Sequence, residues 1–252
     1  MTAVAEAEPQ DSKRKILSGF ESFYGNLLKA SGLSLVVNIK TDGETEEASA
    51  DSNGKEMSIT VSAAFLRSPR LSDDGLRFTL CHELGHLLGG APRRHVPFEW
   101  DGPTAPDGLS FMSSEGQADY YAGRECMRKF LKYDRLQKIN FSDFSGHLLK
   151  MCSQAWKNNK DDIEICVRTA EGAYNMLQLT KDFDISFETP STEVVKATIL
   201  DEYPARQCRL DTALAGALCR QQNPMIFDFN NASVDECPEL TGARPPCWYK
   251  NP

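Results

Sequence analysis

The segment His82-Glu83-Leu84-Gly85-His86 decides how the rest of this chain is interpreted. In an α-helix, residues i and i+4 share one face, so His82 and His86 can present two imidazole nitrogens to one metal ion. Glu83 then lies beside that ion. Two histidines that merely pack in a helical core are the alternative interpretation. The His-Glu-x-x-His spacing nevertheless favours a metal site.

The flanking residues predict that this segment lies on a helix from about residue 73 to 89. Ser72 supplies an N-cap hydroxyl, and two aspartates follow it in the first turn. Gly89-Gly90, with Pro92 shortly beyond, predicts the helix end. The polar face carries Thr79 and the metal-binding residues. The opposite face is an expected core stripe of Leu76, Leu80, Leu84, Leu87 and Leu88.

A catalytic zinc ion needs a third protein ligand and a position open to water. Residues 113–122 predict a second helix, with a serine at its N-cap and Glu115 in its first turn. Ala118, Asp119 and Ala122 share a face with Glu115, and the small alanines allow a neighbouring helix to approach closely. Glu115 is the predicted third ligand, and Asp119 is expected to accept the N–H of a ligating histidine. Solvated surface acids are the alternative.

HELGH followed by a helix with Glu-x-x-Ala-Asp resembles the gluzincin group of zinc metallopeptidases, over residues 71–127. The resemblance implies that His82, His86 and Glu115 bind Zn²⁺, that Glu83 is catalytic and that Asp119 supports the site. It also implies an α+β, zincin-like fold, in which a small antiparallel or mixed sheet covers the active-site helix.

The metzincin pattern is a rival within the same chemistry. It continues from the second histidine of the motif as x-x-Gly-x-x-His. Gly89 fits this pattern, but Pro92 stands where the third histidine belongs. His95 lies three residues too late, so metzincin ligation is the minority interpretation.

Two segments upstream, Leu33–Lys40 and Met57–Ser62, alternate apolar and polar residues and are predicted to be strands, with Asn53-Gly54 as a turn. By the same resemblance, Met57–Ser62 is the candidate edge strand for binding an extended peptide by β-addition. A strand that only packs on the helix fits the same pattern equally well.

The acidic run Asp42–Asp51 lacks the spacing of a calcium loop and is predicted to be a solvated loop.

Between the two motif helices, residues 91–112 are predicted to form a loop that borders the cleft. Its aromatic residues, Phe98, Trp100 and Phe111, either form a side-chain pocket or pin the loop to the core.

The expected activity is zinc-dependent endopeptidase cleavage. Zinc activates water, and Glu83 acts as general base and then general acid. A zinc amidase acting on a non-protein or cell-wall peptide amide, or a non-catalytic metal-binding interaction protein, are the alternatives. Glu83 favours catalysis, because a structural site has no use for a carboxylate beside an open position. The negative charge that develops on the substrate carbonyl oxygen needs a second hydrogen-bond donor besides zinc. Spacing does not choose among six candidates: Tyr120, Tyr121, His95, His147, Tyr203 and Arg209.

Composition limits the possible partners. The chain has 252 residues, a net charge of −8 and no basic stripe, so neither nucleic acid nor an anionic membrane is expected as a partner. No apolar run approaches the roughly 20 residues that a membrane span requires. The expected partner is a peptide or protein substrate, and the sequence makes no prediction of oligomeric state.

Eight cysteines without a CxxC pair favour a disulfide framework and an extracytoplasmic location, periplasmic or secreted. The residues after Met1 do not form a signal peptide, so reduced cysteines in the cytoplasm are the alternative. Cys81 adjoins a ligand but points away from the metal by helix geometry. The cysteines are Cys81, Cys126, Cys152, Cys166, Cys208, Cys219, Cys237 and Cys247.

The expected organisation is a flexible N-terminal segment (1–15), a zincin-like catalytic lobe (16–132) and a mainly helical, cysteine-rich C-terminal lobe with a disulfide-rich tail (133–252). Helical periodicity predicts helices at Asp143–Lys157, Asp161–Leu179 and Asp211–Arg220. This half is expected to pack under Glu115 and to form the other wall of the cleft.

Overall fold

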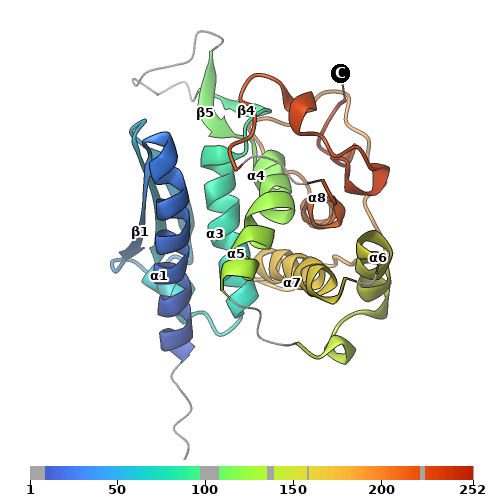
Figure 1. Ribbon diagram of the computed structural model, residues 1–252, viewed down its shortest axis with the longest axis horizontal. Coiled ribbons are helices and arrows are strands. Elements are labelled where there is room, and N and C mark those ends of the chain that lie inside the picture. Colours follow the sequence, from blue (N-terminus) through green and yellow to red (C-terminus); the bar gives the residue numbers. More distant parts are fainter. Residues whose placement is uncertain (1–8, 97–107, 135–138, 158, 222–224, 252) are drawn as a thin grey trace, which may run out of the picture.

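A mixed three-stranded sheet lies along one side of the protein (Figure 1). The computed structural model describes residues 9–96, 108–134, 139–157, 159–221 and 225–251. Strand β1 (Ser34–Lys40) pairs in parallel with β3 (Glu56–Ser62), and β3 pairs antiparallel with β2 (Ala48–Ser52). The predicted turn joins β2 to β3, with Gly54 at a φ of 91°. A small antiparallel or mixed sheet was predicted, and the observed sheet is mixed.

Two expectations about this sheet are wrong. Strand β3 is central, so both of its edges are already hydrogen-bonded and it cannot take up a peptide by β-addition. The acidic run 42–51 is not wholly a loop, because residues 48–51 belong to β2. This strand was not predicted because its half-buried positions are the small residues Ala48, Ala50 and Ser52, which give a weak hydrophobic alternation.

Helix α1 (Pro9–Leu28) packs on β1 and against α3, and a 3₁₀ turn (Lys29–Ser31) follows it. It includes residues 9–15, which were predicted to be flexible; residues 1–8 lie outside the described residues. The helix is held at its start because Lys13 Nζ donates to the Leu66 carbonyl at 2.8 Å, while Ile16 and Phe20 are buried in the core.

Helix α3 (Asp73–Leu88) lies at the centre of the molecule and confirms the predicted helix (Figure 1). The Ser72 hydroxyl accepts from the Gly75 amide at 2.9 Å, and Gly90 leaves the helix at a φ of 69°. The polar face is not solvated as an amphipathic pattern suggests. Every residue from 75 to 88 is buried, because the sheet, α1, α4 and α7 all pack on this helix. The short helix α2 (Ala63–Arg67) precedes it.

Helix α4 (Glu115–Tyr121) crosses α3 at close range and continues through a π-helical turn (Ala122–Cys126) into α5 (Met127–Tyr133). The approach depends on glycine: a Cβ added at Gly85 would lie 2.7 Å from the Ala118 carbonyl oxygen. The flat face predicted around Ala118 is therefore the face that contacts α3. Ser114 occupies the N-cap position of α4, but its side chain caps no amide.

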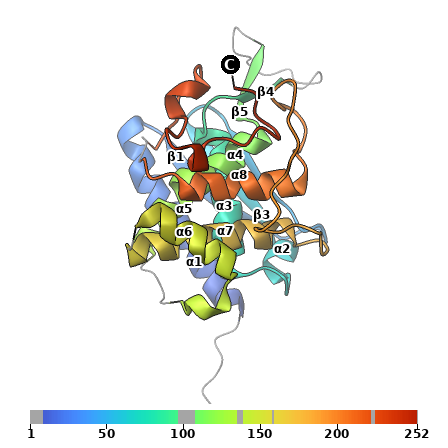
Figure 2. The ribbon, with the colours of Figure 1, turned by 90° about the vertical axis from the view of Figure 1, so that its right-hand side faces the viewer.

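The second half of the chain is mainly helical, as predicted, and packs around α3 and α4 (Figure 2). Helix α6 (Gly146–Trp156) packs on α7 (Lys160–Leu177), α7 packs on α3, and α8 (Arg206–Leu218) packs on α4 and α7. Helix α8 begins five residues before the predicted start. One hydrophobic core cluster runs from Ile16 to Phe227 and includes side chains of both halves. Three 3₁₀ turns complete the described elements: Phe141–Asp143, Ala232–Asp235 and Leu240–Gly242.

The predicted loop 91–112 contains a short antiparallel pair, β4 (Arg93–His95) and β5 (Leu109–Ser113). Phe111 packs against the core from β5. Phe98 and Trp100 lie outside the described residues.

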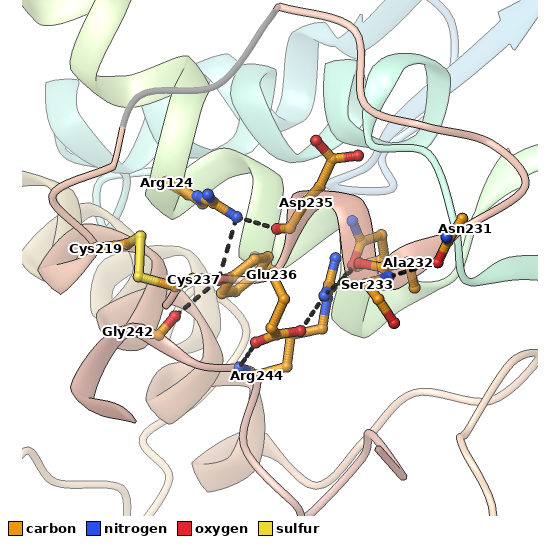
Figure 3. A network of polar contacts seen from close by, with 12 residues as sticks. Arg124, Cys219, Asn231, Ala232, Ser233, Asp235, Glu236, Cys237, Gly242 and Arg244 are labelled. Carbon is orange, nitrogen blue, oxygen red and sulfur yellow. Dashed lines mark hydrogen bonds and ion pairs between the residues drawn. A yellow bond between two sulfur atoms is a disulfide. The ribbon is translucent and has the colours of Figure 1, made fainter. Parts of the chain in front are cut away.

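The C-terminal tail is bound to the outer side of α4 by buried polar contacts (Figure 3). The Tyr120 hydroxyl donates to the Gly242 carbonyl at 2.7 Å, and Arg124 donates to the Asp235 carbonyl. Arg244 donates to Gln117 Oε1 at 2.8 Å and pairs with Glu236. Helix α4 is therefore held by α3 on one side and by the tail on the other.

The predicted disulfide framework is confirmed, with all eight cysteines paired. Cys81 bonds to Cys126, which joins α3 to the π-helical turn after α4. The other bridges are Cys152–Cys166, Cys208–Cys247 and Cys219–Cys237. Among the described residues, no helix combines the length and apolar character needed to cross a membrane.

We expect Gly85→Ala to lower the free energy of unfolding by about 1–3 kcal/mol, because the added methyl forces α3 and α4 apart in a packed core. Urea unfolding followed by circular dichroism measures the change. Gly146→Ala is the matched control, since a Cβ there meets no atom within 4 Å. Equal stability of Gly85→Ala and the wild type would show that the close helix contact is not needed.

Candidate metal centre

Helices α3 and α4 bring His82, His86 and Glu115 together. Their candidate ligand atoms all lie within 4.8 Å of one another. His82 Nε2 is 3.2 Å from Glu115 Oε2, and His86 Nε2 is 3.6 Å from Glu115 Oε1. The Glu115 side chain is 1% exposed. The structure thus places all three predicted ligands in one buried cluster, with the carboxylate facing both imidazoles.

The outer nitrogen of each imidazole faces a separate oxygen atom. His82 Nδ1 is 2.8 Å from Asp119 Oδ1, and His86 Nδ1 is 2.9 Å from the Ser113 carbonyl. Nε2 is the nitrogen directed at Glu115 on both rings, and a proton on Nδ1 suits the oxygens that face it. Asp119 therefore lies where the sequence predicted a supporting carboxylate.

The charges in this cluster are strongly coupled. Burial opposes the charged form of His82, but Asp119 and Glu115 outweigh it and raise the pKa of His82 to about 9. Burial and the positive charge of His82 lower the pKa of His86 to about 3. Burial alone would raise the pKa of Glu115, but the two histidines and Arg209 hold it well below its ordinary value. Glu115 is therefore a carboxylate that is ready to bind a cation.

Arg209, from α8, fixes Asp119 in place. Its Nε donates to Asp119 Oδ2 at 2.6 Å and its Nη2 to Asp119 Oδ1 at 2.9 Å, which is a bidentate pair. The same Nη2 lies 3.8 Å from Glu115 Oε2. The guanidinium is thus committed to orienting Asp119, and through it His82.

Glu83 lies on α3 between the two histidines and is 7% exposed. Burial raises the pKa of Glu83, and the charge of Glu115 adds to the rise, while His82, Arg94 and Arg209 oppose it. A carboxyl group shifted toward neutrality suits a residue that accepts a proton and then returns it.

Of the six candidates for a second oxyanion donor, Tyr203 lies best. It is 68% exposed, and burial of its hydroxyl together with the nearby charge of Glu115 raises the pKa of the phenol. The Arg209 guanidinium carbon lies 5.2 Å from its ring centroid. The others are engaged elsewhere: Tyr120 with Gly242, Tyr121 with Met225, His95 with Asp201, His147 near Glu188 and Arg209 with Asp119.

The sequence did not single out Arg94, on β4. Its Nη2 contacts Glu115 Oε1 and lies 3.4 Å from His86 Nε2. No motif spacing marks this residue. It reaches the cluster because β4 pairs with β5, whose last residue, Ser113, is two residues before Glu115, and a three-residue strand leaves no periodic signal.

Two imidazole nitrogens and one carboxylate oxygen, each oriented by a second group, are a donor set that fits zinc. Among the described residues, Cys219, Cys237 and Glu239 also cluster, but both sulfurs are in a disulfide and supply no thiolate. The chain matches no family model, and no curated protein or solved structure matches it. The geometry of the cluster is therefore the basis for any functional conclusion.

We expect Asp119→Asn to weaken zinc binding by about 10–100-fold, because His82 loses its charged acceptor and Arg209 its bidentate partner. Competition with a chromophoric chelator measures the dissociation constant. Asp182→Asn, which removes an exposed carboxylate paired with Arg70, is the control. Equal affinities of Asp119→Asn and Asp182→Asn would remove Asp119 from the site.

Proposed function

We propose that this protein is a zinc-dependent endopeptidase with a zincin-like catalytic site. The observation that carries the proposal is the convergence of His82 Nε2, His86 Nε2 and Glu115 in a buried cluster, with Glu83 on the same helix. A purely structural zinc site has four protein ligands and needs no carboxylate base. The resemblance of HELGH and Glu-x-x-Ala-Asp to gluzincins supports the same conclusion.

His82, His86 and Glu115 would hold the ion. When bound, zinc would polarise the scissile carbonyl and lower the pKa of the attacking water to about 7. Glu83 accepts the proton of that water and passes it to the leaving amine. The Tyr203 hydroxyl donates a hydrogen bond to the carbonyl oxygen of the substrate as negative charge develops on that oxygen. Asp119 and Arg209 keep His82 oriented throughout.

Strand β2 is the surface best suited to hold an extended peptide. It is an edge of the described sheet, and it packs against α3, which carries the histidines. A peptide that adds to this edge gains main-chain hydrogen bonds and runs alongside the metal-binding helix. The four disulfides support action in an oxidising, extracytoplasmic environment.

We expect the wild type to bind one zinc ion per chain and to cleave a mixed peptide library. Glu83→Gln should keep the zinc and lose cleavage, because the amide cannot accept the proton. Mass spectrometry of the products and metal analysis measure the two properties. Glu115→Gln is the contrasting variant and should lose both. Equal cleavage by wild type and Glu83→Gln would remove Glu83 from the mechanism. Zinc binding without cleavage of any peptide would favour another amide substrate or a binding role.

Tyr203→Phe tests the second donor. We expect kcat to fall by about 10²–10³-fold, the loss measured when one oxyanion donor is removed, with little change in KM or zinc content. Steady-state kinetics on a peptide identified in the library measure the effect. Tyr249→Phe controls for loss of a phenol away from the cluster. A fall in zinc content equal to the fall in kcat would assign Tyr203 to metal retention instead.

A further inference from the structure

Arg94 makes contacts that a metal ion would also make. Its Nη2 faces Glu115 Oε1 and His86 Nε2, which are two of the atoms in the candidate ligand set. Since His86 Nδ1 faces the Ser113 carbonyl, His86 Nε2 carries a lone pair, which accepts from the guanidinium. A divalent ion bound to the same lone pair removes the His86 acceptor of Arg94, and its positive charge at Glu115 repels the guanidinium.

Glu115 needs a cation because its carboxylate is buried. A buried charge without a partner is strongly destabilising. The guanidinium of Arg209 forms its bidentate pair with Asp119 and lies 3.8 Å from Glu115. Arg94 makes the more direct guanidinium contact with Glu115, and it comes from a separate part of the chain, strand β4.

Arg94 is also more accessible than the residues it contacts. Its side chain is 29% exposed, whereas those of Glu115 and His86 are 1% and 5% exposed. Its long side chain connects the buried cluster with solvent, so the guanidinium can withdraw outward without unfolding of α3 or α4. The ligands themselves are fixed by the helices and have no such freedom.

We propose that the Arg94 guanidinium is the counter-ion of Glu115 Oε1 in the metal-free cluster, beside His82 on Oε2, and is exchanged for the metal ion on loading. This inference rests on the proposed zinc site and adds a regulation to it. Arg94 stabilises the protein before metal arrives and lowers its apparent metal affinity, because binding must first displace the guanidinium. If Arg94 occupies the cluster in about nine-tenths of metal-free molecules, the apparent affinity falls by about tenfold.

The test compares Arg94→Gln with Arg14→Gln, which removes the same charge from an exposed position on α1. Zinc dissociation constants come from chelator competition, and melting temperatures are measured with zinc and after chelator treatment. We expect Arg94→Gln to bind zinc about tenfold more tightly than wild type and to melt at a lower temperature when metal-free. Zinc should remove most of that difference. Arg14→Gln should match wild type in both measurements.

Arg94→Lys is the second variant, for use if metal-free Arg94→Gln does not fold. Lysine keeps the charge but lacks the guanidinium fork, so its zinc affinity should lie between those of wild type and Arg94→Gln. Wild-type zinc binding that is lost in His86→Gln but no tighter in either Arg94 variant would overturn the exchange and leave the proposed site intact. A wild type that binds no zinc would overturn both.

Discussion

The close contact between the backbones of Gly85 and Ala118 is the constraint on which the site depends. A short glutamate on one helix can reach histidines on another only if the two helices approach closely. Gly85 allows this because any side chain there would collide with the Ala118 carbonyl. The Cys81–Cys126 bridge joins α3, at the residue before His82, to the π-helical turn that continues α4. Packing and covalent bonding therefore hold both helices at one separation, and the ligand set inherits its geometry from them.

The close approach of α3 and α4 buries the carboxylates of Glu115 and Asp119. Side chains from neighbouring elements supply the positive charges that stabilise them. Glu115 and Asp119 are both at most 1% exposed, and each faces a histidine and a guanidinium. Arg209 arrives from α8, in the second half of the chain, so the helical half contributes to the electrostatics of the cluster as well as to its walls. Without that half, Asp119 would lose its bidentate partner and His82 its fixed orientation.

Local patterns in the sequence predicted the two motif helices, the disulfide framework and the cluster of His82, His86 and Glu115. Each of these predictions depends on residue spacing within a helix or on residue type, and both can be read from a single sequence. Partners from distant elements could not be predicted: Arg209 meets Asp119 across 90 residues, and Arg94 depends on a three-residue strand. Strand β2 and helix α1 were not predicted, because small alanines and an acidic flank hide buried positions that only tertiary packing defines.

The residues around the cluster come from two kinds of element, packed helices and short or irregular segments. The ligands and Asp119 lie on helices held by glycine contacts, a disulfide and the bound tail. Arg94 and Tyr203 lie on a short strand and an irregular segment, and they face Glu115 from the solvent side. These two segments are joined by the exposed pair of His95 and Asp201, 2.7 Å apart. The two segments that face Glu115 from the solvent side are therefore in contact with each other, whereas the candidate ligands come from α3 and α4.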